Sequence, residues 1–190
     1  MTLAAIVALS LLCAAQPMPQ GNVEGLHKLA DSCARALCLQ LRGWQQVSFQ
    51  VAAHPAQWLL EHALANGFAK CGIRPLTSSD SFPRLAVVIM DIGVSYERLS
   101  GDSLRRRLRL SIVATLSLPT GDFLPFPPWR AVSEDVLSIS YLGSVDHPAY
   151  VFATAALPEQ RSVWRELVEP LLAIAAGGVI LLLLFTLRTR

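Results

Sequence analysis

The sequence predicts an α+β domain in which two helices pack on a mostly antiparallel sheet of three or four strands. An apolar amino-terminal signal would precede this domain, and a carboxy-terminal transmembrane helix would follow it. Three observations predict this architecture: two stretches with helical spacing of apolar residues, two long strand-like stretches, and a hydrophobic excess at both ends. Of the 190 residues, 53% are hydrophobic and only 16% are charged, with a mean hydropathy of +0.44. Because soluble domains average about 25% charged residues, this composition argues against a freely soluble cytosolic protein.

The amino-terminal end is predicted to be a signal peptide over residues 1–15. Its apolar run, residues 3–12, is shorter than the about 20 helical residues that a membrane crossing needs, but it suits the apolar region of a signal peptide. Small side chains at Cys13 and Ala15 permit cleavage after Ala15. Two alternatives stay open. One is an uncleaved apolar helix packed on the domain, and the weaker one is a lipid-modified Cys13, because Leu12 fills a position that is normally small.

The carboxy-terminal end is predicted to hold a transmembrane helix over residues 170–187. The run from Leu171 to Leu187 contains no charged residue and would span roughly 26 Å as a helix. Arg188 and Arg190 follow it and account for the net charge of +2. By the positive-inside rule they predict a cytoplasmic tail, residues 188–190. A buried core helix is the alternative.

These two ends predict a single-pass protein of the inner membrane. Residues 16–157 would form an exported α/β domain in the periplasm, and residues 158–169 would form a juxtamembrane segment. Export also bears on the cysteines, because an oxidising compartment permits disulfides.

The first half of the exported domain shows two helical patterns. Apolar residues recur at helical spacing over residues 23–41, and Gly43 provides a stop. A second helix is predicted over 56–71, with Pro55 at its start and Gly72 after its end. Between them, residues 47–53 have the β-branched and aromatic content of a strand.

The second half shows strand patterns. Residues 73–76 predict a short edge strand, because Pro75 would disrupt a central one. Residues 85–96 are apolar on both faces in their first part, as in a central strand. Residues 107–118 alternate apolar and polar side chains, and residues 136–141 predict a fourth strand of an antiparallel meander.

Residues 25–125 resemble small periplasmic α/β domains of envelope assembly. The resemblance rests on WLLEHALANGFAKCGI, then LAVVIMDIGVSY, then RRRLRLSIVATLSLPTGDFL. The families concerned are the CsgG-type amino-terminal domain of curli assembly and the LptE-type lipopolysaccharide-assembly lipoprotein. The carboxy-terminal tail is also similar to that of uncharacterised bacterial single-pass proteins. The resemblance implies a partner within an envelope assembly or transport machinery.

Three cysteines would remain after cleavage of the signal. Cys33 and Cys38 lie on one predicted helix too far apart around its axis to bridge each other, so Cys71 is the intrachain partner for either. A Cys33–Cys71 disulfide is favoured slightly, because Cys33 lies on the apolar stripe. Three free thiols are the open alternative.

The sequence shows no motif of catalysis, of metal binding or of cofactor binding. The histidines (His27, His54, His62 and His147) lack the paired spacing of a zinc site, and no nucleotide-binding glycine motif occurs. Carboxylates are scattered over predicted loops and strand ends: Asp91, Glu97, Asp102, Glu134 and Asp135. We therefore expect no enzyme activity, no metal and no cofactor.

Three features are candidates for interaction. Arg105, Arg106, Arg107 and Arg109 form a patch for an anionic partner, with a solvated strand start as the alternative. Phe123, Phe126 and Trp129 lie in a proline-rich segment that would either dock a partner or cover the core. Ala173, Ala176 and Gly177 form a small-residue face for helix packing, or simply face lipid.

The expected function is therefore a membrane-anchored, exported interaction or scaffold domain, non-catalytic, with a protein partner in the envelope. Nucleic acid is excluded as a partner, because the exported part of the chain carries no net basic charge. The alternatives are an envelope enzyme without a local motif and a small subunit that acts through its transmembrane helix. The sequence does not indicate a small-molecule ligand.

Overall fold

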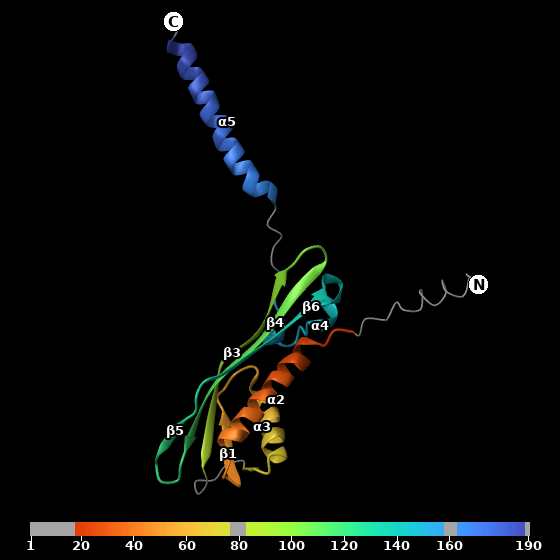
Figure 1. Cartoon of the computed structure of the whole chain (residues 1–190), viewed down its shortest axis with the longest axis vertical. Coiled ribbons are helices and arrows are strands. Elements are labelled where there is room, and N and C mark those ends of the chain that lie inside the picture. The colour runs from red at the N-terminus through yellow and green to blue at the C-terminus, as the bar shows by residue number, and fades with distance from the viewer. Residues whose placement is uncertain (1–17, 77–82, 158–162, 189–190) are drawn as a thin grey trace, which may run out of the picture. The chain divides into compact units, whose positions relative to one another are not determined.

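The computed structural model describes residues 18–76, 83–157 and 163–188 (Figure 1). The chain divides into two compact units, residues 1–157 and 158–190, and each is considered by itself. The predicted signal peptide, residues 1–15, and the end of the predicted cytoplasmic tail lie outside the described residues.

The first unit contains a helix-and-sheet core followed by short helical turns. Its elements in chain order are helix α2 (Asn22–Gln40), strand β1 (Gln46–Val51), helix α3 (Gln57–Lys70), strands β2 (Arg74–Leu76), β3 (Arg84–Arg98), β4 (Ser103–Ser117), β5 (Phe123–Pro125) and β6 (Trp129–Ser138), turn η1 (Ile139–Tyr141), helix α4 (Leu142–Val145) and turn η2 (Val151–Ala153).

The six strands form one mixed sheet with the order β2-β1-β3-β4-β5, and β6 also pairs with β4. Strand β1 runs parallel to both β2 and β3, whereas β3 and β4 form a long antiparallel hairpin with an irregularity between Ile89 and Asp91. Strands β5 and β6 pair with different parts of β4, so both lie beside the edge of β4 that faces away from β3.

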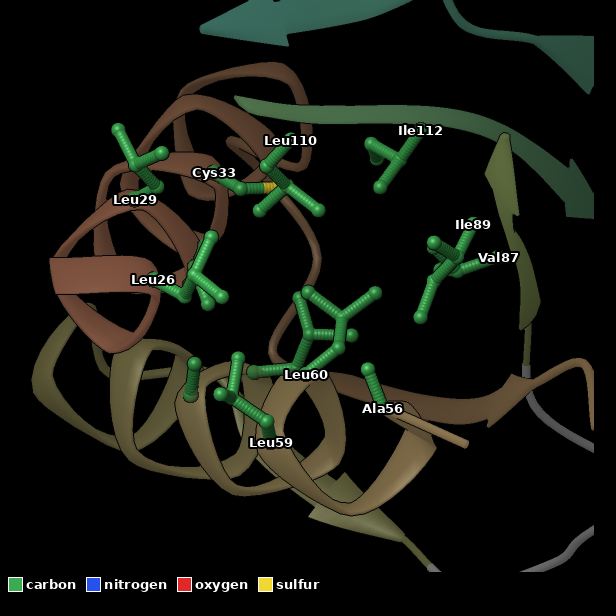
Figure 2. Packing of buried hydrophobic residues seen from close by; sticks show 14 of the residues in the cluster. Leu26, Leu29, Cys33, Ala56, Leu59, Leu60, Val87, Ile89, Leu110 and Ile112 are labelled. Atoms are coloured by element: carbon green, nitrogen blue, oxygen red, sulfur yellow. The ribbon is translucent and has the colours of Figure 1, made fainter. Parts of the chain in front are cut away.

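The core lies between the sheet and helices α2 and α3. Apolar side chains of α2 and α3, such as Leu26 and Leu60, face Val87, Ile89 and Leu110 of the sheet (Figure 2). Every second residue of β4 is buried, because alternate side chains of a strand point to opposite faces. The sheet therefore has one covered face and one outer face, and the outer face carries the exposed residues considered below.

Two glycines allow this close packing. A Cβ at Gly25 of α2 would lie 2.3 Å from a methyl carbon of Leu108 on β4. A Cβ at Gly67 of α3 would lie 2.6 Å from the Cβ of Ala34 on α2. Helix α2 therefore packs tightly against both the sheet and α3.

The predicted two-helix architecture with a mostly antiparallel sheet of three or four strands is wrong. The described residues form four α-helices and a mixed sheet of six strands. Periodicity marks where a strand runs but not which strand it pairs with, and the parallel pairs of β1 join strands that are separated by α3 and by the β2–β3 connection.

The second unit contains helix α5 (Val163–Arg188), which includes Pro170. Among the residues that the structure describes, no helix is both long enough and apolar enough to cross a membrane. The predicted transmembrane helix over residues 170–187 is therefore wrong. Of the predicted juxtamembrane segment, residues 158–169, the part from Val163 onward lies in α5, and the rest lies outside the described residues.

Candidate interaction surface

Three arginines of β4 form a ladder of ion pairs on the outer face of the sheet. Arg105 contacts Glu97 at 3.0 Å, Arg107 contacts Glu134 at 2.6 Å and Arg109 contacts Asp91 at 3.2 Å. The partners come from β3 and β6, the two strands on either side of β4. The charge of the predicted anionic-partner patch is thus compensated within the chain.

Arg106 points to the opposite face and is buried, with only 1% of its surface exposed. Its Nε donates to Oδ1 of Asp135 at 2.8 Å, and its Nη2 donates to the other carboxylate oxygen. Its Nη1 donates to the carbonyl oxygen of Gln20 at 2.6 Å and to Oδ1 of Asn22 at 2.8 Å. The guanidinium therefore joins β6 to the start of α2.

Asn22 continues this buried polar network. Its Nδ2 lies 2.8 Å from the Tyr96 hydroxyl, 2.6 Å from Oδ1 of Asp146 and 2.8 Å from the carbonyl oxygen of Ala153. The Tyr96 hydroxyl donates to the same Asp146 oxygen at 2.5 Å. Burial raises the pKa of Tyr96 above its ordinary value, and the Asp146 carboxylate adds to this effect. The phenol thus stays protonated and holds the segment after β6 against the hairpin.

Strand β6 has a free edge. It pairs with β4 over its whole length, and no strand of the described residues pairs with its other side. The amide of Ile139, the residue after β6, donates to the carbonyl oxygen of Asp102 at 3.0 Å. This bond identifies which residues of β6 form hydrogen bonds with β4. Because bonded and non-bonded residues alternate in an antiparallel pair, the odd-numbered residues of β6 bond to β4. The even-numbered residues therefore direct their N–H and C=O groups outward: Arg130, Val132, Glu134 and Val136.

The side chains along this edge are largely exposed. Six of the ten residues of β6 are exposed, and Val132 and Val136 retain 54% and 62% of their surface. Charged residues often protect an edge strand from pairing with another chain. Here Glu134 and Asp135 pair with arginines of β4, whereas Arg130 is an exposed charge near the start of β6.

A hollow of about 430 Å³ lies beside β6 on the sheet. Its lining includes Met90 of β3, Arg109 of β4 and Val132 of β6. Met90 is 63% exposed, so an apolar side chain stands on each side of this hollow. The hollow therefore lies over β4, between β3 and β6, on the side of β6 away from its free edge.

The proline-rich segment divides between two roles. Phe123 of β5 is exposed, whereas Phe126 and Trp129 are half-buried and pack against the core. Phe126 and Trp129 thus contribute to covering the core, and docking at Phe123 stays a prediction. On α5, Ala173, Ala176 and Gly177 are all exposed, and a Cβ at Gly177 would meet no atom within 4 Å.

The cysteines are free thiols in the structure. Cys33 and Cys38 are buried and Cys71 is exposed. Cys33 points into the core between α2 and the sheet (Figure 2), whereas Cys38 lies beside the end of α3. The favoured Cys33–Cys71 pair is therefore absent here, and Cys38 is the cysteine that lies near Cys71.

The histidines hold local structure. Nδ1 of His54 accepts a hydrogen bond at 3.0 Å from the amide of Ala56, the residue before α3. His27 lies 3.4 Å from Asp31, and its ring packs 5.5 Å from that of His62. No group of three or more metal-ligating side chains occurs among the described residues.

The scattered carboxylates all have partners. Each accepts a hydrogen bond from a side chain of the sheet: Asp91 from Arg109, Glu97 from Arg105, Asp102 from Ser138, Glu134 from Arg107 and Asp135 from Arg106. A larger hollow of about 810 Å³ lies between α3 and the β1–β2 edge and is lined by Glu61 and His62. Both of these side chains already bond to neighbours on their own helix, Gln57 and Asn66.

Sequence reasoning missed two parts of this surface. Strand β6 begins at Trp129, well before the predicted strand 136–141, because its first half lacks an apolar alternation. The inward direction of Arg106 was visible in principle, since it shares the even register of Leu104 and Leu108 on β4. Its partners Asn22 and Asp135 could not be recognised from spacing.

The solved structures that are similar to this chain include two bacterial lipoproteins. A minor lipoprotein from Acinetobacter baumannii has a TM-score of 0.35 and 14% identity, with coverage of 50% of this chain and 70% of the other. Rare lipoprotein B from Shewanella oneidensis has a TM-score of 0.30 and 12% identity, with coverage of 76% and 96%. No family model matches the chain, and no curated protein matches it. Because both TM-scores are below 0.5, these likenesses carry no argument about fold or function.

Proposed function

We propose that this chain is a non-catalytic, protein-binding domain of the bacterial envelope that accepts an extended segment of a partner protein along β6. The observation that carries the proposal is the free edge of β6, where four successive outward-facing residues offer backbone hydrogen bonds. Addition of a strand to an exposed edge is a recurrent mode of peptide recognition. The envelope setting is the one that the sequence resemblance implies.

The side chains beside this edge support a protein strand as the occupant. Val132 and Val136 are exposed on the outer face, and Met90 lies across the hollow from Val132. Backbone bonds would supply affinity, and the exposed valines of β6 would contact side chains of the added strand. The ion pairs of Arg105, Arg107 and Arg109 leave the surrounding face without a strong field, which fits an apolar strand better than an anionic ligand.

The non-catalytic part of the proposal has separate support. The candidate carboxylates accept hydrogen bonds from arginine or serine side chains, and His54 accepts one from the amide of Ala56. These bonds support a structural role for these side chains.

Site-specific photo-cross-linking tests the proposal. A photoreactive residue at Val136 in the full chain, in the cells that produce it naturally, is expected to give one dominant protein adduct. Val132→Pro should abolish this adduct, because proline removes an outward N–H that the partner strand needs but leaves the bonds between β4 and β6 in place. Val132→Thr is the matched control, since it keeps the N–H and should keep the adduct.

The position of the cross-linker supplies the second control. A photoreactive residue at Val88, on the outer face of β3, should not give the same adduct, because Val88 is separated from β6 by β4. Equal adducts from Val88 and Val136, or an adduct that survives Val132→Pro, would overturn strand addition at β6. An adduct with twice the mass of the chain would show that two copies pair, and it would contradict a separate protein partner.

A further inference from the structure

Helices α2 and α3 run side by side in the same direction, and this brings two cysteines together. The ring of His27 packs against that of His62, and further along both helices Ala34 lies against Gly67. One helical turn beyond this contact, α2 carries Cys38 and α3 ends at its cap residue Cys71. The lack of a side chain at Gly67 allows the helices to approach closely at this point.

One carbonyl oxygen joins the two cysteines. The Cys38 thiol donates to the carbonyl oxygen of Gly67 at 3.4 Å, and the amide of Cys71 donates to the same oxygen at 3.1 Å. Both cysteines line one hollow of about 550 Å³. Cys71 is exposed and is followed by Gly72 with φ +77°, so its side chain has room to turn toward Cys38.

We propose that Cys38 and Cys71 form a disulfide by exchange with a disulfide-bearing oxidant. This proposal does not depend on the binding role of β6. It replaces the Cys33–Cys71 pair, because the Cys33 side chain lies in the core between α2 and the sheet (Figure 2).

The reaction proceeds in two exchanges. The exposed Cys71 thiol loses its proton and attacks one sulfur of the oxidant, R–S–S–R; a Cys71–S–R bond forms and one thiolate leaves. Cys38 then loses its proton and attacks the Cys71 sulfur; the Cys38–Cys71 bond forms and the second thiolate leaves. The two thiolates take up the two protons, so the protein loses two hydrogens and the oxidant becomes two thiols.

The environments of the two thiols support this order. Burial raises the pKa of Cys38 to about 12, and a hydrogen bond and the charge of Cys71 add to this effect. Cys38 is therefore a poor first nucleophile. Because both cysteines bond to the same Gly67 carbonyl oxygen, Cys38 is close to the Cys71 sulfur for the second exchange. Arg35 and Arg42 line the same hollow and favour the approach of an anionic oxidant.

Disulfide mapping of the intact chain with glutathione disulfide as the oxidant tests the proposal. The reduced full-length protein is incubated with glutathione disulfide, alkylated, digested and analysed without reduction. We expect a cross-linked peptide pair that contains Cys38 and Cys71, while Cys33 becomes alkylated only after unfolding. The disulfide closes a loop of about 30 residues, so the oxidised chain should melt about 10 °C above the reduced chain.

Three variants make the outcome specific. Cys38→Ser, and Cys38→Ala as a second version, should leave glutathione attached to Cys71 with no gain in melting temperature. Cys33→Ser should still form the disulfide. A Cys33–Cys71 peptide, a disulfide between two chains through Cys71, or a lasting glutathione adduct on Cys71 of the unaltered chain would each overturn the proposal.

Discussion

Nη1 of Arg106 lies 2.8 Å from Oδ1 of Asn22, although 84 positions separate the two residues in the chain. The first belongs to β4 and the second opens α2, so this bond joins the sheet to the helix layer. Asn22 uses its other polar atom to reach Tyr96, Asp146 and the carbonyl oxygen of Ala153. One buried amide therefore connects four separate parts of the first unit.

Asn22→Ala is expected to lower the free energy of unfolding by about 3 kcal/mol, because it leaves several buried polar groups without partners. Chemical denaturation monitored by circular dichroism measures this loss. Asn66→Ala is the matched control, since Asn66 makes an exposed bond to His62 and its removal should cost less than about 1 kcal/mol. Equal losses in the two variants would show that the network around Asn22 contributes no more to stability than one exposed hydrogen bond does.

Arg106→Ala and Arg107→Ala compare neighbouring arginines that point to opposite faces. We expect a loss of about 3–5 kcal/mol for Arg106→Ala, because the buried Asn22 oxygen and the Gln20 carbonyl lose their donor. The exposed Arg107–Glu134 pair should contribute less than about 1 kcal/mol. Denaturant titrations of both variants in low and high salt measure this difference. A similar loss for both residues would contradict the inward placement of Arg106.

Gly67→Ala should destabilise the fold by about 1–3 kcal/mol, because the added Cβ would lie 2.6 Å from the Cβ of Ala34. Adding Ala34→Gly to this variant removes the clash and should restore part of the loss, which a double-mutant cycle would detect. Gly143→Ala serves as the control, since a Cβ there meets no atom within 4 Å. If the effects of the two substitutions on stability were simply additive, the close approach of α2 and α3 would not be the cause of the loss in Gly67→Ala.

The buried Cys33 thiol should make the fold sensitive to alkaline pH. Burial raises the pKa of Cys33 from 9.0 to about 12. The unfolded chain releases this proton near pH 9, whereas the folded chain holds it until about pH 12. The contribution of this thiol to folding stability is therefore fully present below pH 9, and it is lost as the pH rises from 9 to 12.

Cys33→Ala tests this pH dependence in the presence of a reductant. The stability difference between the unaltered chain and Cys33→Ala should be constant up to about pH 8 and should then shift by up to about 1.4 kcal/mol per pH unit. Urea denaturation from pH 7 to pH 10 provides the measurement. A difference that stays constant over this range would show that the Cys33 thiol is not protonated preferentially in the fold.

Proline substitutions at Val132 and Ser133 test the direction of the backbone bonds of β6. Val132→Pro should cost about 1 kcal/mol, because it removes an N–H that points away from β4. Ser133→Pro should cost about 3 kcal/mol or more, because Ser133 is an odd-numbered residue whose N–H bonds to β4. Thermal denaturation of both variants measures these losses, and the opposite ranking would show that the free edge carries the odd-numbered residues instead.

Local patterns in the sequence determined where the main elements of the first unit lie. The apolar stripe over residues 23–41 predicted α2, the stripe over 56–71 predicted α3, and the alternation over 107–118 predicted most of β4. These predictions depend on the repeat of side chains along one element, and that repeat can be read from neighbouring residues.

Only the tertiary structure decided which elements lie together. It paired β1 with β2 and β3 in parallel, extended β6 back to Trp129, and placed Cys38 rather than Cys33 beside Cys71. It also separated the four clustered arginines of β4. Three of them form ion pairs on the outer face of the sheet, and Arg106 joins a buried network. The physical reason is that hydrogen bonds and ion pairs join groups far apart in the chain, and no local repeat records those partners.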